Sequence, residues 1–149
     1  MLKPRYITIE GPIGVGKTSL ARMLARQFNA KLVLERPEEN PFLDKFYQQP
    51  ERYAFQVQTF FLLSRFRQQQ ELSQLDLFEQ SIISDYLFAK DRIFAYLNLS
   101  GQELGLYEQI FHLLNARIAK PDLAVFLQAR PEVLAERIRK RNKPYEKDL

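Results

Sequence analysis

One stretch of eight residues constrains the fold more than any other part of the chain. This stretch, GPIGVGKT at residues 11–18, matches the pattern G-x-x-x-x-G-K-[ST] in full. The β-rich run YITIE (6–10) precedes it, and the helix-forming run KTSLARMLARQF overlaps its end. In such a loop the glycines let backbone N–H groups point inward around phosphate oxygens, next to the positive end of the helix dipole. The sequence therefore predicts a loop that binds a polyphosphate.

Two side chains in this loop have predicted roles of their own. Lys17 is expected to contact the β- and γ-phosphates of ATP, and the Thr18 hydroxyl is expected to be a ligand of Mg²⁺. The predicted nucleotide-binding residues of the loop are Gly11, Pro12, Ile13, Gly14, Val15, Gly16, Lys17, Thr18 and Ser19. The loop alone does not identify the reaction, because GTPases, motor proteins and small-molecule kinases share it.

The rest of the chain predicts strands that alternate with helices. Further strands are expected at 31–35, at 81–85 and in DLAVFLQ after Pro121, and long helices at about 51–72, 87–99 and 102–118. Pro41 and Pro131 suit the first turns of a short helix and of the final helix. This alternation is typical of an α/β protein in three layers, α/β/α, with a parallel sheet between the helices.

The positive charge of the chain lies in one short segment near its C-terminus. The net charge is +4, and six basic and two acidic residues between Arg130 and Lys143 account for all of it. A nucleic-acid binder usually spreads a basic stripe over a face or a tail, whereas one compact basic segment suits a polyphosphate. We therefore expect a basic C-terminal lid over the nucleotide and no nucleic-acid partner.

The composition also excludes some classes of protein. Because the chain contains no cysteine, it has no disulfide framework and no thiolate metal site. Its N-terminus shows no signal-peptide core, and no apolar run approaches the roughly 20 residues needed to span a bilayer. The sequence therefore predicts a cytoplasmic protein without a membrane partner.

Two carboxylates stand at the ends of predicted strands. Glu35 ends the second strand and Asp85 ends the third. Because the carboxyl ends of parallel strands meet at one crevice, we expect both beside the phosphate-binding loop. A carboxylate there can accept a proton from an attacking hydroxyl, and a second can bind Mg²⁺. Glu35 suits the role of base and Asp85 that of metal ligand, although the two roles could be exchanged.

The stretch ERPEENPF bears on the charge of the phosphate acceptor. Like charges about 4 Å apart repel by ~4 kcal/mol at intermediate dielectric, so Glu35, Glu38 and Glu39 disfavour an acceptor that already carries phosphate. The stretch therefore favours a neutral hydroxyl acceptor, provided that Arg36 points away. The alternative is that Glu38 and Glu39 form a solvated entry to the next helix.

Five stretches, in order along the chain, carry a resemblance to a known family. They are GPIGVGKT, ERPEENPF, FYQQPERYAFQVQTFFLLSRFRQ, SDYLFAKDRIF and PDLAVFLQARPEVLAERIRKRNKPYE. Together they resemble the deoxynucleoside kinase family, and most closely its bacterial deoxyadenosine/deoxyguanosine kinase branch. The resemblance covers essentially the whole chain. It implies transfer of the γ-phosphate of ATP to the 5′-hydroxyl of a purine-preferring deoxynucleoside, as in nucleotide salvage, usually by a homodimer.

The resemblance also implies roles for residues that would hold the deoxynucleoside. Glu35 matches the carboxylate at the 5′-hydroxyl, and Tyr47 matches a tyrosine at the sugar 3′-hydroxyl. Glu146 falls where the family places a second contact to that hydroxyl. Gln58 matches an amide that reads the base edge.

A second set of implied roles concerns charged residues. Arg65 and Asp91 resemble the pair over the base, and Arg65 would share one helix face with Gln58, seven residues earlier. Arg137 and Arg141 match lid arginines that close on the ATP phosphates. Two of these implied roles have a structural alternative. Gln58 could simply lie on a polar face of a glutamine-rich helix, and Arg137 and Arg141 could lie at an exposed, solvated helix end.

The chain departs from the family pattern at two places. Where the family commonly has an acidic residue followed by arginine, this chain has Asp85 and Tyr86. Tyr86 is therefore expected at the substrate. Arg92 or a lid arginine could take the role of the absent arginine. The chain also stops at KPYEKDL. We therefore expect residues 1–149 to form one kinase domain that lacks its C-terminal strand and helices.

Two other functions remain open. A thymidylate-kinase-like monophosphate kinase also joins such a loop to a basic lid, but its relatives have a glycine-rich acceptor loop where this chain has ERPEENPF. A non-catalytic nucleotide-binding homologue is the second alternative. The presence of Lys17, Thr18 and Glu35 together weighs against it, because a scaffold has no need of that set.

Overall fold

The computed structural model describes residues 5–74 and 81–143. The chain divides into two compact units, each with its own hydrophobic core. The first unit contains Met1–Leu34, Glu79–Leu87 and Lys120–Leu149, and the second contains Glu35–Phe78 and Phe88–Ala119. No helix in the described part of the chain is long and apolar enough to cross a membrane.

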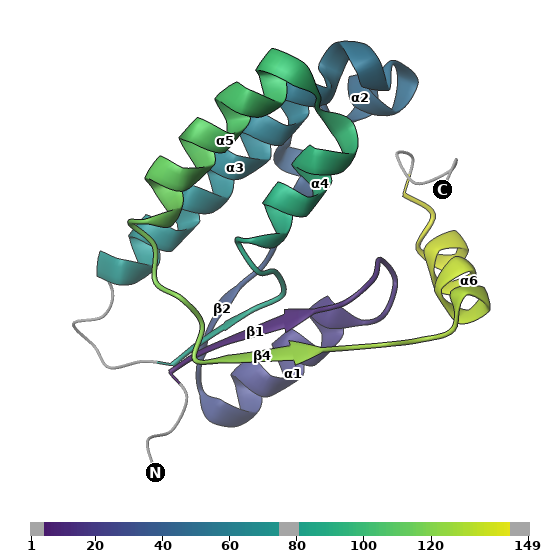
Figure 1. The fold of residues 1–149 in the computed structure, drawn as a ribbon. Helices are drawn as coiled ribbons and strands as arrows, with labels where there is room; N and C mark the ends of the chain where they lie inside the picture. The colour runs from purple at the N-terminus through teal and green to yellow at the C-terminus, as the bar shows by residue number, and fades with distance from the viewer. Residues whose placement is uncertain (1–4, 75–80, 144–149) are drawn as a thin grey trace. The chain divides into compact units, whose positions relative to one another are not determined.

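The first unit is built around a parallel sheet of four strands (Figure 1). The strands are β1 (Tyr6–Glu10), β2 (Lys31–Val33), β3 (Ile82–Ser84) and β4 (Leu123–Phe126), in the spatial order β2-β3-β1-β4. Every pairing is parallel, with Thr8 of β1 opposite Ser84 on one side and Ala124 on the other. The predicted α/β class with a parallel sheet is therefore confirmed. Because all strands run the same way, their carboxyl ends meet at one edge of the sheet.

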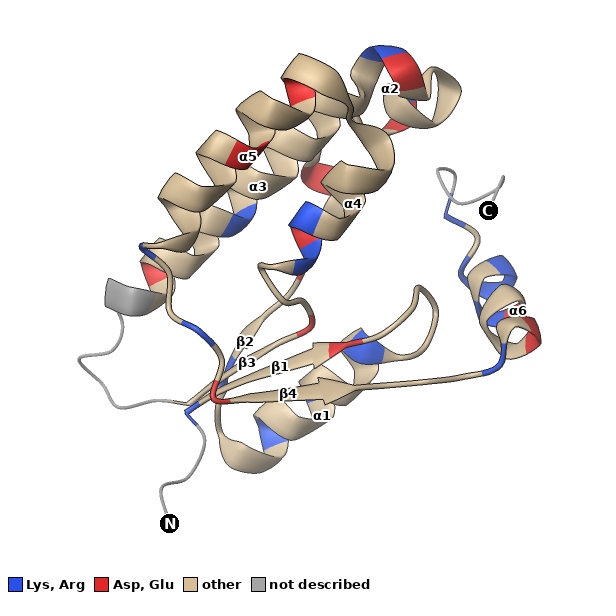
Figure 2. Ribbon diagram, viewed as in Figure 1, with Lys and Arg blue, Asp and Glu red and all other residues tan. Residues whose placement is uncertain are grey.

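Helices α1 and α6 belong to the first unit. Helix α1 (Lys17–Phe28) connects β1 to β2, and its Ala21 and Ala25 pack against Ile9 and Ile83 of the sheet. Helix α6 (Pro131–Arg141) begins with proline in its first turn, where no backbone N–H is needed, as the sequence predicts. Its last turn carries Arg139, Lys140 and Arg141, which complement the negative end of the helix dipole (Figure 2).

The second unit is helical. It contains the 3-10 turn η1 (Pro37–Glu39), α2 (Leu43–Gln48), α3 (Pro50–Gln74), α4 (Lys90–Asn98) and α5 (Gly101–Asn115). Its core lies where α3, α4 and α5 pack together. The buried residues of this core are Ala54, Leu62, Phe88, Ala95, Leu99, Tyr107 and Phe111. Phe111 stacks on Phe88 and on Tyr107, with ring centroids 5.6 and 6.2 Å apart.

Candidate active site

The predicted phosphate-binding loop lies between β1 and α1. Gly16 caps α1 with φ of +104°, a backbone conformation that favours glycine. At Gly11 a Cβ atom would lie 2.6 Å from the carbonyl oxygen of Leu127, just past β4, so only glycine allows the chain to pass there. Two glycines of the motif are therefore required by the backbone itself.

Lys17 and Thr18 both reach partners within the first unit. The Lys17 ammonium donates hydrogen bonds to the carbonyl oxygens of Gly11, at 2.8 Å, and Pro12, at 3.3 Å. The Thr18 hydroxyl donates to Oδ2 of the buried Asp85 at 2.6 Å. The structure thus brings together the two residues that the sequence predicts as metal ligands.

The donor set of Thr18 and Asp85 fits Mg²⁺. A hydroxyl and a carboxylate supply the oxygen ligands that this ion prefers, and Mg²⁺ usually completes its coordination with waters and substrate phosphates. In the described residues no group of three or more His, Cys, Asp or Glu side chains could hold a metal by itself. A metal at Thr18 and Asp85 would therefore depend on the nucleotide for further ligands.

Glu10 is a residue of this region that sequence reasoning missed. Its buried carboxylate accepts hydrogen bonds from the backbone N–H of Gly11, at 3.1 Å, and of Leu87, at 2.8 Å. It therefore joins the start of the loop to the segment after β3. Its place as the last residue of β1, directly before the loop, was the available signal. Tyr86 lies in the same segment and is only 1% exposed.

Helix α6 contacts the loop through Arg137. One guanidinium nitrogen, Nη1, donates to the carbonyl oxygens of Val15 at 3.0 Å and Gly14 at 3.5 Å. Arg141 is exposed on the last turn of α6. Arg137 thus lies against the loop that it is predicted to assist, and the role of α6 as a lid stays a prediction.

In the second unit, Arg65 of α3 bridges two acidic residues. Its Nη1 donates to Oδ1 of Asp91 at 2.5 Å, and its Nη2 donates to Oε1 of Glu35. The guanidinium also lies 5.0 Å from the ring centroid of Phe61, one turn earlier on α3. The structure therefore joins Glu35, Arg65 and Asp91 in one network. The predicted place of Glu35 beside the loop stays a prediction.

Tyr107 of α5 completes this network and was not found from the sequence. Its hydroxyl donates to Oδ2 of Asp91. Burial raises the pKa of the Asp91 carboxyl, against the lowering effects of Arg65 and of the hydrogen bond from Tyr107. Burial also raises the pKa of the Tyr107 hydroxyl, and the neighbouring Asp91 carboxylate raises it further. Tyr107 therefore keeps its proton and stays a donor to Asp91.

Gln58 and Tyr47 are two further predicted substrate contacts in the second unit. Gln58 is on α3, two turns before Arg65, and is only 4% exposed. Its side-chain oxygen Oε1 has no hydrogen-bond partner within the part of the chain that the structure describes. Tyr47 is half-buried on α2, with its ring edge-to-face with Phe46 at 5.5 Å. Glu146 lies outside the described residues.

The acidic stretch ERPEENPF divides into two parts. Glu38 and Glu39 are exposed in η1, and Arg36 donates to Oε1 of Glu39 at 3.2 Å. Glu35 alone joins the inner network, where Arg65 balances its charge. Turn η1 directs the side chains of Glu38 and Glu39 to solvent. Their exposure fits the alternative of a solvated helix entry for these two residues, and the neutral hydroxyl acceptor stays a prediction.

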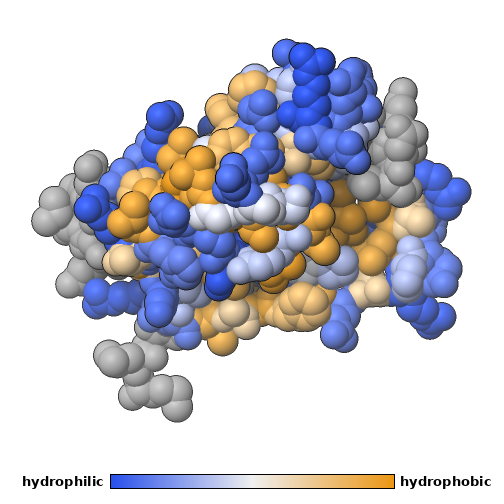
Figure 3. Space-filling model, turned by 45° about the horizontal axis from the view of Figure 1, so that its top comes forward, coloured by the Kyte–Doolittle hydropathy of each residue, from blue (hydrophilic) through white to orange (hydrophobic). Residues whose placement is uncertain are grey.

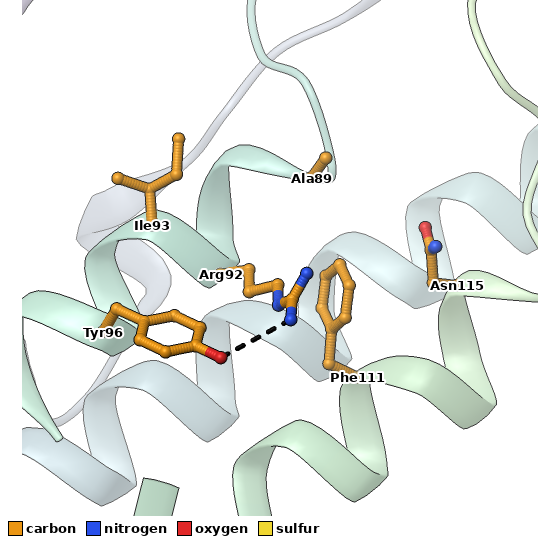
Figure 4. A pocket seen from close by; sticks show the side chains of 6 residues that line it. All are labelled: Ala89, Arg92, Ile93, Tyr96, Phe111 and Asn115. Atoms are coloured by element: carbon orange, nitrogen blue, oxygen red, sulfur yellow. Dashed lines mark hydrogen bonds between the residues drawn. The ribbon is translucent and has the colours of Figure 1, made fainter. Parts of the chain in front are cut away.

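Arg92, considered as a substitute for the arginine absent at position 86, pairs with Glu108 within the second unit. Its Nε and Nη2 donate to the two carboxylate oxygens of Glu108, at 2.7 and 2.9 Å, and this hydrogen bonding lowers the pKa of Glu108. It forms part of a pocket of about 460 Å³ between α4 and α5 (Figure 4). The lining residues are Ala89, Arg92, Ile93, Tyr96, Phe111 and Asn115.

The parallel sheet, the loop after β1 and the Thr18–Asp85 contact define a P-loop nucleotide-binding protein. The sequence profile of the deoxynucleoside kinase family matches residues 7–149. The chain belongs to this family of ATP-dependent phosphotransferases, as the sequence predicts.

Individual relatives agree with this assignment. The chain is 41% identical to a deoxyguanosine kinase of Bacillus subtilis (strain 168), over 97% of the chain and 70% of the relative. It is 36% identical to a deoxyadenosine kinase of Dictyostelium discoideum, over 99% of the chain and 61% of the relative. The fold resembles that of a deoxyadenosine kinase from M. mycoides, with a TM-score of 0.79 and 24% identity over 95% of this chain and 73% of that one. The chain thus spans about two thirds of the length of these relatives.

Proposed function

We propose that the protein transfers the γ-phosphate of ATP to the 5′-hydroxyl of a deoxynucleoside and prefers purine bases. The observation that carries this proposal is the network of Glu35, Arg65 and Asp91. The same unit holds the buried Gln58 oxygen Oε1, which has no hydrogen-bond partner among the described residues. Together these groups supply a base for a hydroxyl and polar contacts for a nucleobase. The family of the chain supports the reaction.

The first unit supplies the nucleotide end of the proposed reaction. The loop N–H groups, Lys17 and the α6 arginines Arg137 and Arg141 would bind the phosphates of ATP. Thr18 and Asp85 would hold Mg²⁺, which when bound would neutralise phosphate charge. The protein atoms thus orient the triphosphate and counter its charge, which is most of what phosphoryl transfer requires.

The second unit supplies the hydroxyl end. Glu35 would accept the proton of the 5′-hydroxyl, and Arg65 donates to one oxygen of its carboxylate. Tyr47 would donate to the 3′-hydroxyl. Tyr86, which belongs to the first unit, and Glu146, which lies outside the described residues, remain part of the proposed substrate contacts. An amide such as Gln58 can donate and accept at once, as a nucleobase edge demands.

The base preference rests on Gln58, Arg65 and Asp91. A buried acceptor without a partner costs about 1–3 kcal/mol, and a base amino group that donates to Gln58 Oε1 would remove this cost. Adenine, cytosine and guanine each carry an exocyclic amino group and thymine carries none, so this contact disfavours thymine and does not by itself select purines over cytosine. The names deoxyguanosine kinase and deoxyadenosine kinase of the relatives support purines as the preferred class.

The test is a parallel assay of phosphoryl transfer. The protein is incubated with Mg-ATP and deoxyadenosine, deoxyguanosine, deoxycytidine, thymidine or thymidine monophosphate, and the products are separated. We expect selective conversion of the two purine deoxynucleosides. Conversion of thymidine monophosphate alone would replace the proposal by a monophosphate kinase, and no conversion at all would favour a non-catalytic homologue.

We also propose that the protein forms a homodimer. Large apolar side chains of α4 and α5 are strongly exposed, among them Leu97 at 74% and Leu113 at 70%. Figure 3 shows apolar side chains at the molecular surface among hydrophilic ones. Exposed apolar groups that gather on neighbouring helices are typical of surfaces covered in an assembly. A second copy of the chain is the proposed cover.

A further inference from the structure

A chain of three contacts leads from the core of the second unit to Glu35. Tyr107 of α5 donates its hydroxyl hydrogen to Oδ2 of Asp91 on α4. Arg65 of α3 donates to Oδ1 of the same carboxylate, and its other terminal nitrogen donates to Glu35. Each of the three contacts therefore depends on the orientation of the one before it. Tyr107 is the first residue of this series of contacts, and it lies in the core of the second unit.

The position of the Tyr107 hydroxyl is set by packing. The residue is 0% exposed, and its ring stacks on Phe111 with an interplanar angle of 20°. Phe111 in turn stacks on Phe88 at an angle of 16°. Close packing of this kind leaves a ring one orientation, so the hydroxyl is a fixed point in the core.

The carboxylate of Asp91 has one fixed partner for each oxygen. The terminal torsion of an aspartate is broad, so a single partner leaves the carboxylate able to rotate. With Tyr107 on Oδ2 and Arg65 on Oδ1, rotation would break one of two hydrogen bonds. The fixed Asp91 carboxylate and the ring of Phe61 then orient the Arg65 guanidinium, whose other terminal nitrogen donates to Glu35.

We propose that Tyr107 is a positioning residue for the deoxynucleoside end of the active site. This proposal rests on the proposed function, since it takes Arg65, Asp91 and Glu35 as substrate contacts. Tyr107 itself is buried behind Asp91 and touches no substrate. Its hydroxyl holds Asp91, and thereby Arg65, in the orientation that receives the base and the 5′-hydroxyl. The charged and titratable groups around this contact are Glu35, Arg65, Asp91 and Glu108.

The variant Tyr107→Phe tests this proposal because it removes one oxygen atom and keeps the ring. Its matched control is Tyr96→Phe on α4, whose exposed hydroxyl is the acceptor of a long contact with Arg92 at 3.5 Å. Both variants lose one phenolic hydroxyl, and only Tyr107 contacts Asp91. Thermal unfolding of each variant establishes a temperature at which it is fully folded.

Steady-state kinetics at that temperature give the main readout. We expect Tyr107→Phe to raise KM for deoxyadenosine by about tenfold, as for the loss of a hydrogen bond to a charged group, with KM for ATP unchanged. Tyr96→Phe keeps both values. In an Asp91→Ala background, Tyr107→Phe should add no further loss in kcat/KM, because the two residues act through one contact. Unchanged KM for deoxyadenosine, or additive losses in the double variant, would overturn the proposal.

A second measurement separates this proposal from the proposed function. NMR of protein with ¹⁵N-labelled arginine reports how firmly the Arg65 guanidinium is held. Tyr107→Phe should broaden or shift the Arg65 signals, and Tyr96→Phe should not. If the wild-type protein phosphorylates no deoxynucleoside while the Arg65 signals still respond, the function fails and the positioning contact stands. If the Arg65 signals of Tyr107→Phe are the same as those of the wild type, the positioning role is wrong, regardless of the kinase activity of the variant.

Discussion

At the scale of single residues, Glu35 is the side chain on which the proposed chemistry depends most. Replacing it by glutamine keeps the size of the group and removes its ability to accept a proton. We expect Glu35→Gln to lower kcat by at least tenfold. The loss can reach the roughly 10²–10⁴-fold that general-base catalysis contributes. ATP binding, measured by calorimetry, should be retained, since the loop lies in the other unit.

Glu38→Gln is the matched control for this prediction. Glu38 lies three residues away, on the exposed turn η1, and its replacement removes the same charge. We expect wild-type kcat for this variant. Equal losses in both variants would mean that the charge of the whole stretch matters, and unchanged turnover in Glu35→Gln would remove Glu35 as the base.

Asp85 offers a second test at this scale, directed at the metal. Its Oδ2 accepts the hydroxyl hydrogen of Thr18 at 2.6 Å, so both groups meet at the predicted Mg²⁺ position. We expect Asp85→Asn to raise the Mg²⁺ concentration for half-maximal activity by about tenfold or more. Titrations of activity with Mg²⁺ at fixed ATP measure this value. The exposed Asp122→Asn serves as control, and an unchanged Mg²⁺ requirement in Asp85→Asn would contradict the assignment.

Single residues differ in how far the sequence alone predicts them. The loop GPIGVGKT is visible in the sequence because backbone geometry demands glycine at Gly11 and Gly16. The pairing of Arg65 with Glu35 spans 30 positions, and no local period reports it. The pairing of Arg65 with Asp91 was predictable only through a family resemblance. Tyr107 was missed because a tyrosine within an apolar helix has the pattern of a core residue.

At the scale of elements, the order of strands and helices was predictable and their ends were less so. Periodicity and proline positions indicate where an element lies, whereas its end depends on hydrogen bonds from distant residues. The helix expected at 87–99 begins instead at Lys90, and the N–H of Leu87, ahead of it, donates to the Glu10 carboxylate. Strand β2 ends at Val33, two residues before Glu35.

A prediction about the pairing of β1 and β4 concerns Asp122, which directly precedes β4. Its exposed carboxylate accepts hydrogen bonds from the backbone N–H of Tyr6, at 2.9 Å, and of Arg5, at 2.8 Å. These bonds, that from Tyr6 first, lower the pKa of Asp122. A carboxyl whose pKa is lower in the folded protein adds stability above its unfolded pKa and loses it as pH falls through its folded pKa.

We therefore expect Asp122→Asn to unfold at a lower temperature than the wild type near pH 7. The two melting temperatures should converge as the pH falls below the ordinary aspartate pKa and through the lowered pKa of the folded Asp122 carboxyl, where the wild-type carboxyl is also protonated. Thermal unfolding followed by circular dichroism across this pH range measures the difference. Asp44→Asn, at the exposed first turn of α2, is the control. A constant gap at all pH values would show that the effect is not the charge of Asp122.

At the scale of the whole molecule, the proposed ligands divide between the two units. The residues predicted for ATP and Mg²⁺ lie in the first unit, and Glu35, Tyr47, Gln58, Arg65 and Asp91 lie in the second. The units interleave along the chain, since segments of the first lie on both sides of each segment of the second. Strand and helix periodicity carries no signal for this division. For that reason the sequence predicted a single domain and could not show how its segments group.

The proposed homodimer gives the last prediction, and it concerns α4 and α5. A glutamate at an exposed position costs a monomer little, because surface substitutions usually change stability by less than about 0.5 kcal/mol. In a dimer interface the same charge would be buried without a partner and would be strongly unfavourable. We expect Leu97→Glu to convert a dimer into a monomer in light scattering. Met23→Glu, on the exposed face of α1 in the other unit, should leave the dimer intact. A wild-type monomer, or equal dissociation by both variants, would refute α4 and α5 as the dimer surface.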